Sequence, residues 1–454
     1  MLDVDARGLS GRHSVQRIGM MRWLYRMLIV AALPFAATLF AIRGLRGYPG
    51  EQRGLLQRFG FGRRQSDNTL WIHAVSVGEV QAAVTLVRSL RSRYPTIPMT
   101  LTTTTGTGAR RAREAFGDAV DIRFLPFDSL GCVRRFLDRV RPRVAIIVEK
   151  ELWPNLYGEC AARAIPVVIA SATMSARAER RMQKLAPLFR DVFASGIRIA
   201  AQSEVDAERF RRLGVAPSRV QVIGNLKFDL TLSAQLPEQG AALRARCGWQ
   251  DRLLLVGGST YELEESALLE AQRRLRREGI DLALVLAPRH PSRFESVAAR
   301  LQSDGIVHAR RSQLEVMPAR APDVLLLDTL GELMGAYAAA DLAFVGGSLV
   351  ADVGGHNLIE PAALGIPAIA GPHVYNAPEV AADLRAAGAL STCVDTESLI
   401  AEVRSLVTNK DERFRRGARG RAFVENNRGT LERLLGYLEP LMAESLARSP
   451  TTNR

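Results

Sequence analysis

The sequence predicts an α/β protein built from two doubly wound domains. Short apolar runs of strand type alternate with helix-type segments along two stretches of the chain, and residues 226–248 interrupt the alternation once. Such alternation implies a parallel sheet covered by helices on both faces. A chain of 454 residues also exceeds one ordinary hydrophobic core, so two domains and a leader are expected.

The composition narrows the class of partner. With 47% hydrophobic and 24% charged residues, the chain is globular and not disordered. The net charge of +14 indicates an anionic partner: a nucleic acid, an anionic membrane surface or a phosphorylated substrate. Aromatic residues make up only 6% and show no stacking pattern, which argues against nucleic acid. The four cysteines are far apart without a CxxC pair, so neither a zinc site nor a disulfide framework is indicated, and a reducing compartment fits.

Residues 1–47 form a basic leader with an apolar segment. The uncharged run at residues 27–42 contains Pro34 and is shorter than the roughly 20 residues that span a bilayer, although Trp23 and Tyr25 could extend it at the interface. A signal anchor and a helix lying in the membrane plane both remain open. A buried core helix is less favoured, because the flanking arginines suit a membrane surface. The run lacks a clear small-x-small cleavage site, which argues against a cleaved signal peptide.

The first domain is expected at residues 48–230 and the second at residues 231–405, with the two domains facing a cleft. An arginine-rich helical tail, residues 406–454, should pack across one domain or bridge both. In the first domain strands are predicted at residues 70–75, 99–103, 122–125, 144–148, 167–170, 197–201 and 220–223, with helices that include 78–90 and 108–115. In the second they are predicted at residues 253–256, 282–286, 324–327, 342–345 and 368–370, with a helix at 262–278.

A glycine-rich stretch, residues 346–367, follows a predicted strand and leads into a helix. Its four glycines before Asn357 allow a backbone to approach a ligand closely, and Asn357 can cap the helix. Free N–H groups and the helix dipole would favour a phosphate there. Glu360, in the first turn, is placed as a carboxylate that takes ribose hydroxyls. Alternatively, Asn357 and Glu360 form only a capping box.

Glu79 directly follows the first predicted strand and opens its helix. A carboxylate at the carboxyl end of a strand can act as a general base, and the helix N-terminus is expected to keep it ionised at neutral pH. The alternative is a capping box between Ser76 and Glu79. A second acidic segment, Glu149 to Glu151, follows another buried strand. Two acids at such a place are costly unless they form ion pairs or have a function. An ion pair of Lys150 on a helix face is the simpler reading.

Other loops at strand ends carry further candidates. The threonine-rich loop at residues 102–108 could hold an acidic group, and it is not a dinucleotide fingerprint, because Arg111 replaces the last glycine. Residues 257–260 form a possible anion nest, and Arg289 can pair with an oxyanion. Residues 328–333 open the next helix, and Lys227 lies at the domain junction. No metal site is evident, since the one D-x-D motif lies at residues 3–5.

Several of these segments together resemble the 3-deoxy-D-manno-octulosonic acid (Kdo) transferases of lipid A assembly. The resemblance runs from the N-terminal anchor to about residue 400 in the same motif order. It rests on HAVSVGE at 73–79, EKELWPNL at 149–156, GNLKFD at 224–229, GGST at 257–260, APRHP at 287–291, DTLGELM at 328–334 and GGHNLIEPAALG at 354–365.

The resemblance implies the GT-B fold and transfer of Kdo from CMP-Kdo to a lipid A precursor (lipid IVA), with inversion, without a metal and without a cofactor. It implies the cytoplasmic face of the inner membrane as the location. By motif, Glu79 is similar to the proton acceptor, and Glu149 and Lys227 to the residues that stabilise the transition state. The implied CMP contacts are Pro288, Arg289, Gly331, Glu332, Leu333, Asn357, Leu358, Ile359 and Glu360.

The chain departs from the family pattern at a few positions. Lys150 stands where Thr is usual, Tyr261 where His commonly follows GST, residues 350–354 span a loop one residue longer than expected, and residues 1–19 extend the N-terminus. Two other functions remain open: a GT-B transferase that uses a UDP-sugar on a lipid acceptor, and a non-catalytic protein that binds a membrane surface.

Overall fold

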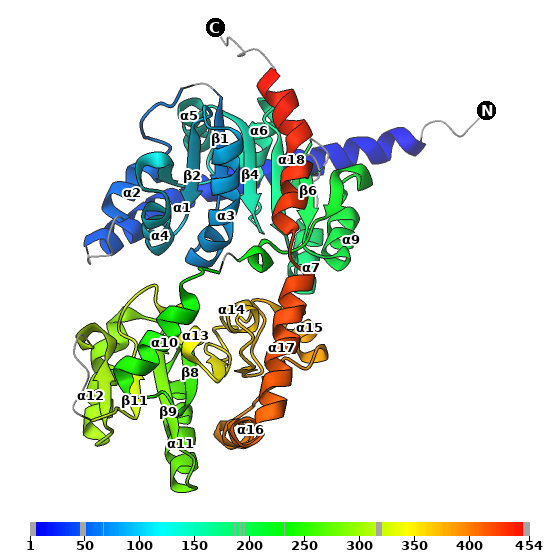
Figure 1. The fold of residues 1–454 in the computed structure, drawn as a ribbon. Helices are drawn as coiled ribbons and strands as arrows, with labels where there is room; N and C mark the ends of the chain where they lie inside the picture. Colours follow the sequence, from blue (N-terminus) through cyan, green and yellow to red (C-terminus); the bar gives the residue numbers. More distant parts are fainter. Residues whose placement is uncertain are drawn as a thin grey trace. The chain divides into compact units, whose positions relative to one another are not determined.

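The computed structural model describes residues 6–45, 51–66, 68–149, 151–185, 188–189, 193, 196–230, 232–314 and 320–447, with side chains described from residue 20 and not at 43–45 or 51–53. Two compact units are present (Figure 1). Unit 1 comprises Met1–Asp229 and Gly429–Arg454, and unit 2 comprises Leu230–Arg428. The division lies one residue from the expected boundary. The expected tail, residues 406–454, is not a unit of its own, because it is divided between the two.

Unit 1 contains a parallel sheet of seven strands in the order β3-β2-β1-β4-β5-β6-β7. Its strands are β1 (Thr69–His73), β2 (Met99–Thr103), β3 (Asp121–Phe124), β4 (Pro142–Val148), β5 (Val167–Ala172), β6 (Arg198–Ala201) and β7 (Val220–Val222). Its helices are α1 (Ala6–Leu45), α2 (Glu51–Arg58), α3 (Val77–Arg93), α4 (Gly106–Phe116), α5 (Leu130–Val140), α6 (Pro154–Ala162), α7 (Ala176–Lys184), α9 (Glu204–Arg212) and α18 (Thr430–Ala447).

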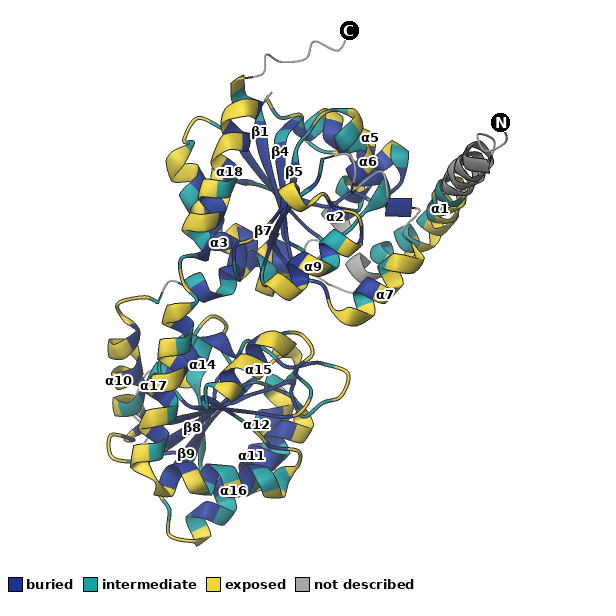
Figure 2. Cartoon of the chain, turned by 90° about the vertical axis from the view of Figure 1, so that its right-hand side faces the viewer, coloured by how far each residue is buried: buried dark blue, intermediate teal, exposed yellow. Residues whose placement is uncertain are grey.

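The strands of unit 1 are buried on both faces, as the near-continuous apolar runs predict (Figure 2). Side chains alternate between two cores: Ile72 and Ile146 lie in the core that includes α3 and α18, whereas Trp71 and Ile147 lie in the opposite one. Strands β1 and β4 are neighbours although β2 and β3 lie between them in sequence. The strand order therefore reverses direction at β1 and β4, which is where open α/β sheets bind ligands.

Unit 2 repeats the architecture with the strand order β10-β11-β9-β8-β12-β13-β14. Its strands are β8 (Leu253–Thr260), β9 (Leu282–Pro288), β10 (His308–Arg310), β11 (Val324–Leu326), β12 (Leu342–Val345), β13 (Ala368–Ala370) and β14 (Leu390–Thr392). Its helices are α10 (Leu236–Cys247), α11 (Glu262–Arg277), α12 (Phe294–Ser303), α13 (Leu333–Ala339), α14 (Ile359–Ala363), α15 (Pro378–Ala386), α16 (Thr396–Thr408) and α17 (Lys410–Asn426).

Three elements of unit 2 were not expected. Strands β10 and β14 are only three residues long and lie at the two edges of the sheet, where pairing on one side leaves a weak sequence pattern. Helix α10 occupies the stretch expected to interrupt the alternation. Pro237 is the second residue of this helix, where its missing N–H has no cost, so it does not break the helix.

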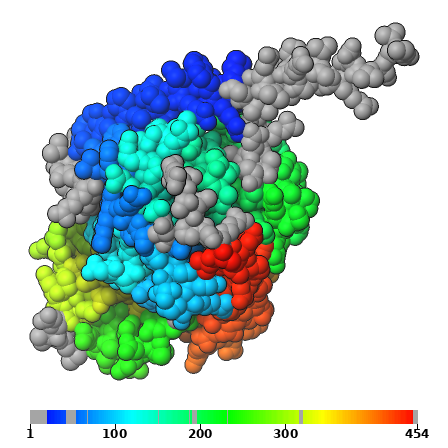
Figure 3. Space-filling model, turned by 90° about the horizontal axis from the view of Figure 1, so that it is seen from above, coloured from blue at the N-terminus to red at the C-terminus, as the bar shows by residue number. Residues whose placement is uncertain are grey.

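Helix α1 carries the apolar segment of the leader. Within it, residues Met20–Ile42 are long and apolar enough to cross a membrane by length and composition, and none of the most apolar part is buried. A buried core helix is therefore excluded for this segment. Large apolar side chains, among them Trp23, Leu28 and Phe35, are exposed. The helix also contacts unit 1, because the rings of Phe40 and Phe127 lie 6.0 Å apart and α1 runs along the surface of this unit (Figure 3).

Helix α18 returns to unit 1 from the end of unit 2 and completes its core. Leu434, Leu438 and Met442 pack into the same core as β1. The N-terminus of α18 is capped by Asp229, whose carboxylate accepts the N–H of Gly429 at 2.7 Å and the N–H of Leu431. The two residues that bracket unit 2 in the sequence are thus joined by hydrogen bonds.

Replacing Asp229 by alanine should lower the free energy of unfolding by about 1–2 kcal/mol, because two N–H groups at a helix start lose their acceptor. Urea unfolding would measure this change. The exposed Asp118 of unit 1 makes no side-chain hydrogen bond or ion pair with any described residue, and Asp118→Ala serves as the matched control. Equal unfolding midpoints for the two variants would contradict the role given to Asp229.

Candidate active site

The turn between β1 and α3 presents Glu79 at the carboxyl end of the sheet. Ser76 occupies the N-cap position with extended backbone angles, but its hydroxyl makes no capping hydrogen bond. The Glu79 carboxylate accepts the N–H of Val75 at 2.6 Å. A capping box would require Glu79 to accept the N–H of Ser76, so the capping-box alternative does not describe this turn.

Burial raises the pKa of Glu79 to about 7, and repulsion by the carboxylates of Glu149 and Glu151 adds to the shift. The N–H of Val75 and the charge of Lys227 act in the opposite direction. The expectation that the helix N-terminus keeps Glu79 ionised at neutral pH is therefore corrected. Desolvation outweighs the single N–H, and the group titrates near neutrality, where a proton acceptor is most effective.

Glu149 directly follows β4, the neighbour of β1. It is 6% exposed, and its backbone adopts φ of 68°, a left-handed conformation that few side chains tolerate. Its carboxylate forms an ion pair with the Lys227 ammonium at 2.6 Å. Lys227 comes from the 3-10 turn Leu226–Asp229. The ion pair expected for Lys150 concerns a residue that lies outside the described part of the chain.

The structure thus brings together Glu79, Glu149 and Lys227, the three site residues that the sequence predicts in the first domain. Glu79 and Glu149 follow adjacent strands, and Lys227 pairs with Glu149 and lowers the pKa of Glu79. Within the described residues, the cluster contains three carboxylates and one ammonium when Glu151 is included. Such a group of acids repels further negative charge, and within it burial is the main cause of the raised pKa of Glu79.

The threonine-rich loop has a different role from the one expected. The hydroxyls of Thr103, Thr104 and Thr105 all donate to the backbone carbonyl of Val75, at 2.7, 3.3 and 3.3 Å. They are therefore not directed at an external acid. Because the N–H of Val75 binds Glu79, the loop holds in place the residue whose N–H binds this carboxylate.

In unit 2 the start of the glycine-rich loop does not offer free N–H groups to a phosphate. The carboxylate of Glu264, from α11, accepts the N–H groups of Gly347, Ser348 and Leu349 at 2.8–2.9 Å. Burial raises the pKa of Glu264, and these hydrogen bonds oppose the shift. The anion expected in this part of the loop is thus supplied by the protein itself. The sequence showed Glu264 only as one of several acids in a helix.

The expected anion nest at residues 257–260 is also corrected, because these residues are the end of β8. A Cβ on Gly258 would lie 1.9 Å from the Tyr337 hydroxyl, and a Cβ on Gly257 would lie 2.5 Å from Leu268. The two glycines are required by close packing of helices against the strand, and not by a ligand.

The later part of the loop remains open to a ligand. The Asn357 side-chain oxygen accepts the N–H of Ile359 at 3.1 Å, and its amide donates to Glu360 at 3.1 Å. This is not the reciprocal capping box, because Glu360 does not accept the N–H of Asn357. In the described part of the chain nothing accepts a hydrogen bond from the N–H groups of Asn357 and Leu358. Ile359 and Leu358 are buried, so their side chains support the turn.

Arg289 follows Pro288 at the end of β9, one strand from β8 and two from β12. Its side chain is exposed and has no hydrogen-bond or ion-pair partner among the described residues. Its charge acts on Glu360, since it opposes the rise in pKa that burial causes there. A guanidinium and backbone N–H groups of this kind are able to bind a phosphate.

Three aromatic rings adjoin Arg289. Tyr261 stacks on His356 with centroids 6.0 Å apart and meets His290 edge to face at 5.6 Å. Burial and the charge of Arg289 lower the pKa of His356 to about 4, so this imidazole is neutral at pH 7. Tyr261, one of the departures from the family pattern, therefore belongs to this group. The sequence alone did not predict that these three rings lie together.

Residues 331–333 lie after β11, at the start of α13. Gly331 has φ of 86°, which favours glycine, and Glu332 occupies the N-cap position. The carboxylate of Glu332 is already engaged by the guanidinium of Arg311 at 2.6 Å and by the hydroxyl of Thr329. Any ligand contact here would use the backbone more readily than this carboxylate.

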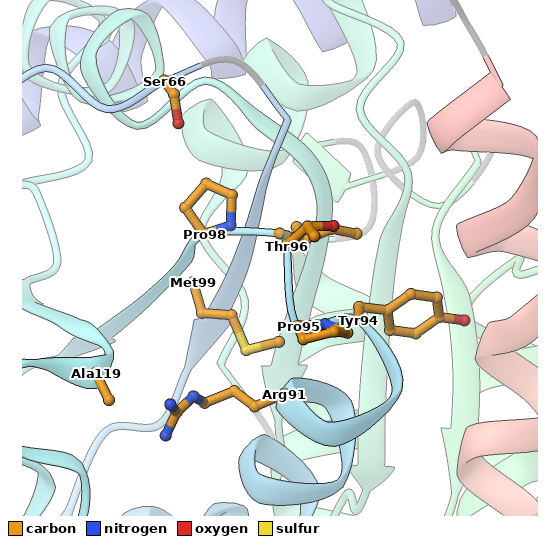
Figure 4. Close-up of a pocket in the computed structure, with 9 residues that line it drawn as sticks. Ser66, Arg91, Tyr94, Pro95, Thr96, Pro98, Met99 and Ala119 are labelled. Carbon is orange, nitrogen blue, oxygen red and sulfur yellow. The ribbon is translucent and has the colours of Figure 1, made fainter.

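A hollow of about 310 Å³ lies at the opposite end of the sheet in unit 1 (Figure 4). It is lined by Ser66, Arg91, Tyr94, Pro95, Thr96, Ile97, Pro98, Met99 and Ala119. Met99 begins β2, so the hollow is at the amino ends of the strands, away from the acids. Parallel sheets bind ligands at the carboxyl ends, and we do not assign this hollow to the site. No group of three metal-binding side chains occurs among the described residues.

The geometry predicts how the pKa of Glu79 responds to its neighbours. Glu149→Gln should lower this pKa from about 7, because a repelling charge is removed, and Lys227→Gln should raise it. Infrared titration, with Glu79→Gln as the reference, would measure both shifts. Glu114→Gln, an exposed change on α4, should leave the pKa unchanged. A rise in Glu149→Gln would contradict the arrangement.

Comparison with known proteins supports the resemblance stated above. Residues 53–230 match the family described as 3-deoxy-D-manno-octulosonic-acid transferase (kdotransferase), and residues 323–423 match glycosyl transferases group 1. The chain is 37% identical to the 3-deoxy-D-manno-octulosonic acid transferase of Haemophilus influenzae over 432 residues, which cover 94% of this chain and 100% of that protein. It is 38% identical to the transferase of the same name from Bordetella pertussis, over 82% of this chain and 86% of that protein.

The fold agrees with these matches. A crystal structure of UDP-N-acetylglucosamine 2-epimerase is similar with a TM-score of 0.55 and 15% identity, covering 84% of this chain and 97% of that one. At this identity the likeness concerns the fold alone. The prediction of a two-domain GT-B architecture is confirmed by this likeness and by the two parallel sheets. The chain is a glycosyltransferase that belongs to the 3-deoxy-D-manno-octulosonic acid transferase family.

Proposed function

We propose that the protein transfers Kdo from CMP-Kdo to a lipid A precursor, lipid IVA, in lipopolysaccharide biosynthesis. The observation that supports this most directly is the cluster at the carboxyl ends of β1 and β4, in which a carboxyl with a pKa near 7 adjoins an ion pair. A proton acceptor of this kind is what a hydroxyl nucleophile requires. Family membership supports Kdo as the sugar.

The proposed reaction is a single displacement. The ionised Glu79 takes the proton of a sugar hydroxyl on the lipid while that oxygen bonds to the anomeric carbon of Kdo. The bond from this carbon to the phosphate oxygen breaks, and CMP leaves with the electron pair, so that the configuration inverts. Glu149 and Lys227 would stabilise charge in the transition state, since their ion pair fixes an ammonium next to the reacting groups.

Unit 2 would hold the cytidylate. Arg289 and the unpaired N–H groups of Asn357 and Leu358 provide charge and hydrogen bonds for one phosphate, and Glu360 provides a carboxylate for ribose hydroxyls. Pro288, Gly331, Glu332, Leu333 and Ile359 complete the proposed contacts. CMP carries a single phosphate, and a guanidinium with backbone N–H groups can offset its charge, so we propose a reaction that needs neither a metal nor a cofactor.

We further propose that α1 attaches the protein to the cytoplasmic face of the inner membrane while lying in the membrane plane. One side of this helix contacts unit 1 through Tyr25 and Phe40, which are fifteen positions apart, so this length of the helix lies along the unit. The other side exposes Leu28 (61%) and Phe35 (75%). The basic residues of the leader and the net charge of +14 suit an anionic lipid surface.

Glu79→Gln should reduce Kdo transfer by a factor of about 100 to 10,000, because the proton acceptor is lost, and CMP binding should be kept. Mass analysis of lipid IVA after incubation with CMP-Kdo measures transfer, and calorimetry measures CMP binding. In the unmodified protein the rate should rise with pH through about 7, as Glu79 ionises. Glu114→Gln is the control.

Two results would exclude the proposal in favour of its alternatives. Turnover of a UDP-sugar, with none of CMP-Kdo, would identify a GT-B transferase with another donor. Full biological function of Glu79→Gln would identify a non-catalytic protein of the membrane surface. Loss of CMP affinity in Arg289→Ala, with no loss in the exposed control Arg277→Ala, would support the proposed donor site.

The double variant Leu28→Glu, Phe35→Glu should bind vesicles of anionic phospholipid at least about tenfold more weakly, because two carboxylates enter the apolar face. Vesicle flotation would measure this loss. The control is Val394→Glu, Phe414→Glu, which changes exposed apolar residues of unit 2. Unchanged flotation of the α1 variant would show that this face does not bind the membrane.

A further inference from the structure

The N-terminus of α6 is not capped by its own sequence. Trp153 occupies the N-cap position and makes no side-chain hydrogen bond there, and Pro154 follows it. The acceptor comes from Asp128, which precedes α5. Its carboxylate accepts the N–H of Asn155 at 3.1 Å and the N–H of Leu156 at 2.8 Å. One remote carboxylate therefore satisfies two of the free N–H groups of α6.

The same carboxylate is bound by the apolar leader. The hydroxyl of Tyr25, on α1, donates to Asp128 at 2.7 Å. The next residue, Arg26, donates to the side-chain oxygen of Asn155 at 3.4 Å, and the Asn155 amide donates to the Asp128 carbonyl at 2.6 Å. Asp128 is 4% exposed and forms no ion pair within the described ranges. Its charge thus depends on three hydrogen bonds, and α1 provides one of them.

This junction adjoins the turn that presents Glu149. Only residues 150–153 separate Glu149 from α6, and the hydroxyl of Tyr157, on α6, donates to the Glu151 carbonyl. The position of α6 therefore limits the position of Glu149, whose left-handed backbone has to be held by its surroundings. Both acids that repel Glu79 belong to this turn.

We propose that α1 is a functional part of the active site, in which Tyr25 completes the cap that Asp128 places on α6 and thereby positions Glu149 against Lys227 and Glu79. Tyr25 and Asp128 are then positioning residues for transfer. A helix that attaches the protein to a membrane would, through this contact, also set the geometry of the reacting acids. The part concerning catalysis rests on the function proposed above.

The test compares Tyr25→Phe with Tyr437→Phe in the full chain. Tyr437 is a partly buried tyrosine of the same unit whose hydroxyl donates to the Arg219 carbonyl at 3.1 Å, so its loss is a matched structural change. The first readout is the pKa of Glu79 by infrared titration without substrate. Among the described residues, the charged groups that act on Glu79 are Glu149, Glu151 and Lys227. Displacement of the turn that carries the two acids should lower this pKa in Tyr25→Phe only.

The second readout separates kcat from KM. Tyr25→Phe should lower kcat by about tenfold, because small displacements of reacting groups slow the chemistry, and leave the affinity for CMP unchanged. The acidic limb of its rate profile should shift to lower pH together with the pKa of Glu79. Asp128→Asn should act in the same direction and more strongly, since it removes a charged acceptor from two N–H groups.

A pKa of Glu79 in Tyr25→Phe equal to that of the unmodified protein would overturn the inference, as would equal shifts in Tyr25→Phe and Tyr437→Phe. This titration needs no substrate, so it decides the inference even if the unmodified protein transfers no Kdo. An absence of Kdo transfer by the unmodified protein would contradict the proposed function, but it would not contradict the inference about Tyr25.

Discussion

A carboxylate withdrawn from water must find compensating charge or hydrogen bonds, or else take up a proton. The adjacency of β1 and β4 imposes this condition on Glu79 and Glu149 at once, because both follow the carboxyl ends of neighbouring strands. Glu149 meets it through the ammonium of Lys227. Glu79 has one backbone N–H and two repelling acids, and its pKa rises to about 7.

This compensation has a consequence for stability. The pKa of Glu79 in the folded chain lies above the ordinary value of 4.5, so the folded state binds more protons than the unfolded state between these pH values. The free energy of unfolding falls as the pH rises through this interval. The ionised form that can accept a proton from a substrate is therefore the form that weakens the fold, which is a common property of catalytic acids and bases.

Remote carboxylates also hold the backbone around the site. Asp128 caps α6, Asp229 caps α18, and Glu264 binds the loop after β12. In each case buried or partly buried N–H groups receive their acceptor from another part of the chain, since donors withdrawn from water without partners are costly. The acids that shape the molecule thus differ from the acids that face the reaction, although both kinds occur at the ends of strands and helices.

The sequence by itself determined the two parallel sheets and the loops that carry the candidate residues, because apolar period and strand-end position are local properties of the chain. Short edge strands such as β14 were not predicted, since three residues are too few to show an apolar periodicity. Which charges meet was decided only by the tertiary structure. Glu149 pairs with Lys227, and Glu264 binds the N–H groups at the start of the glycine-rich loop, where the sequence predicts a phosphate. Strand order brings these groups together, although they lie 78 or more residues apart in the sequence.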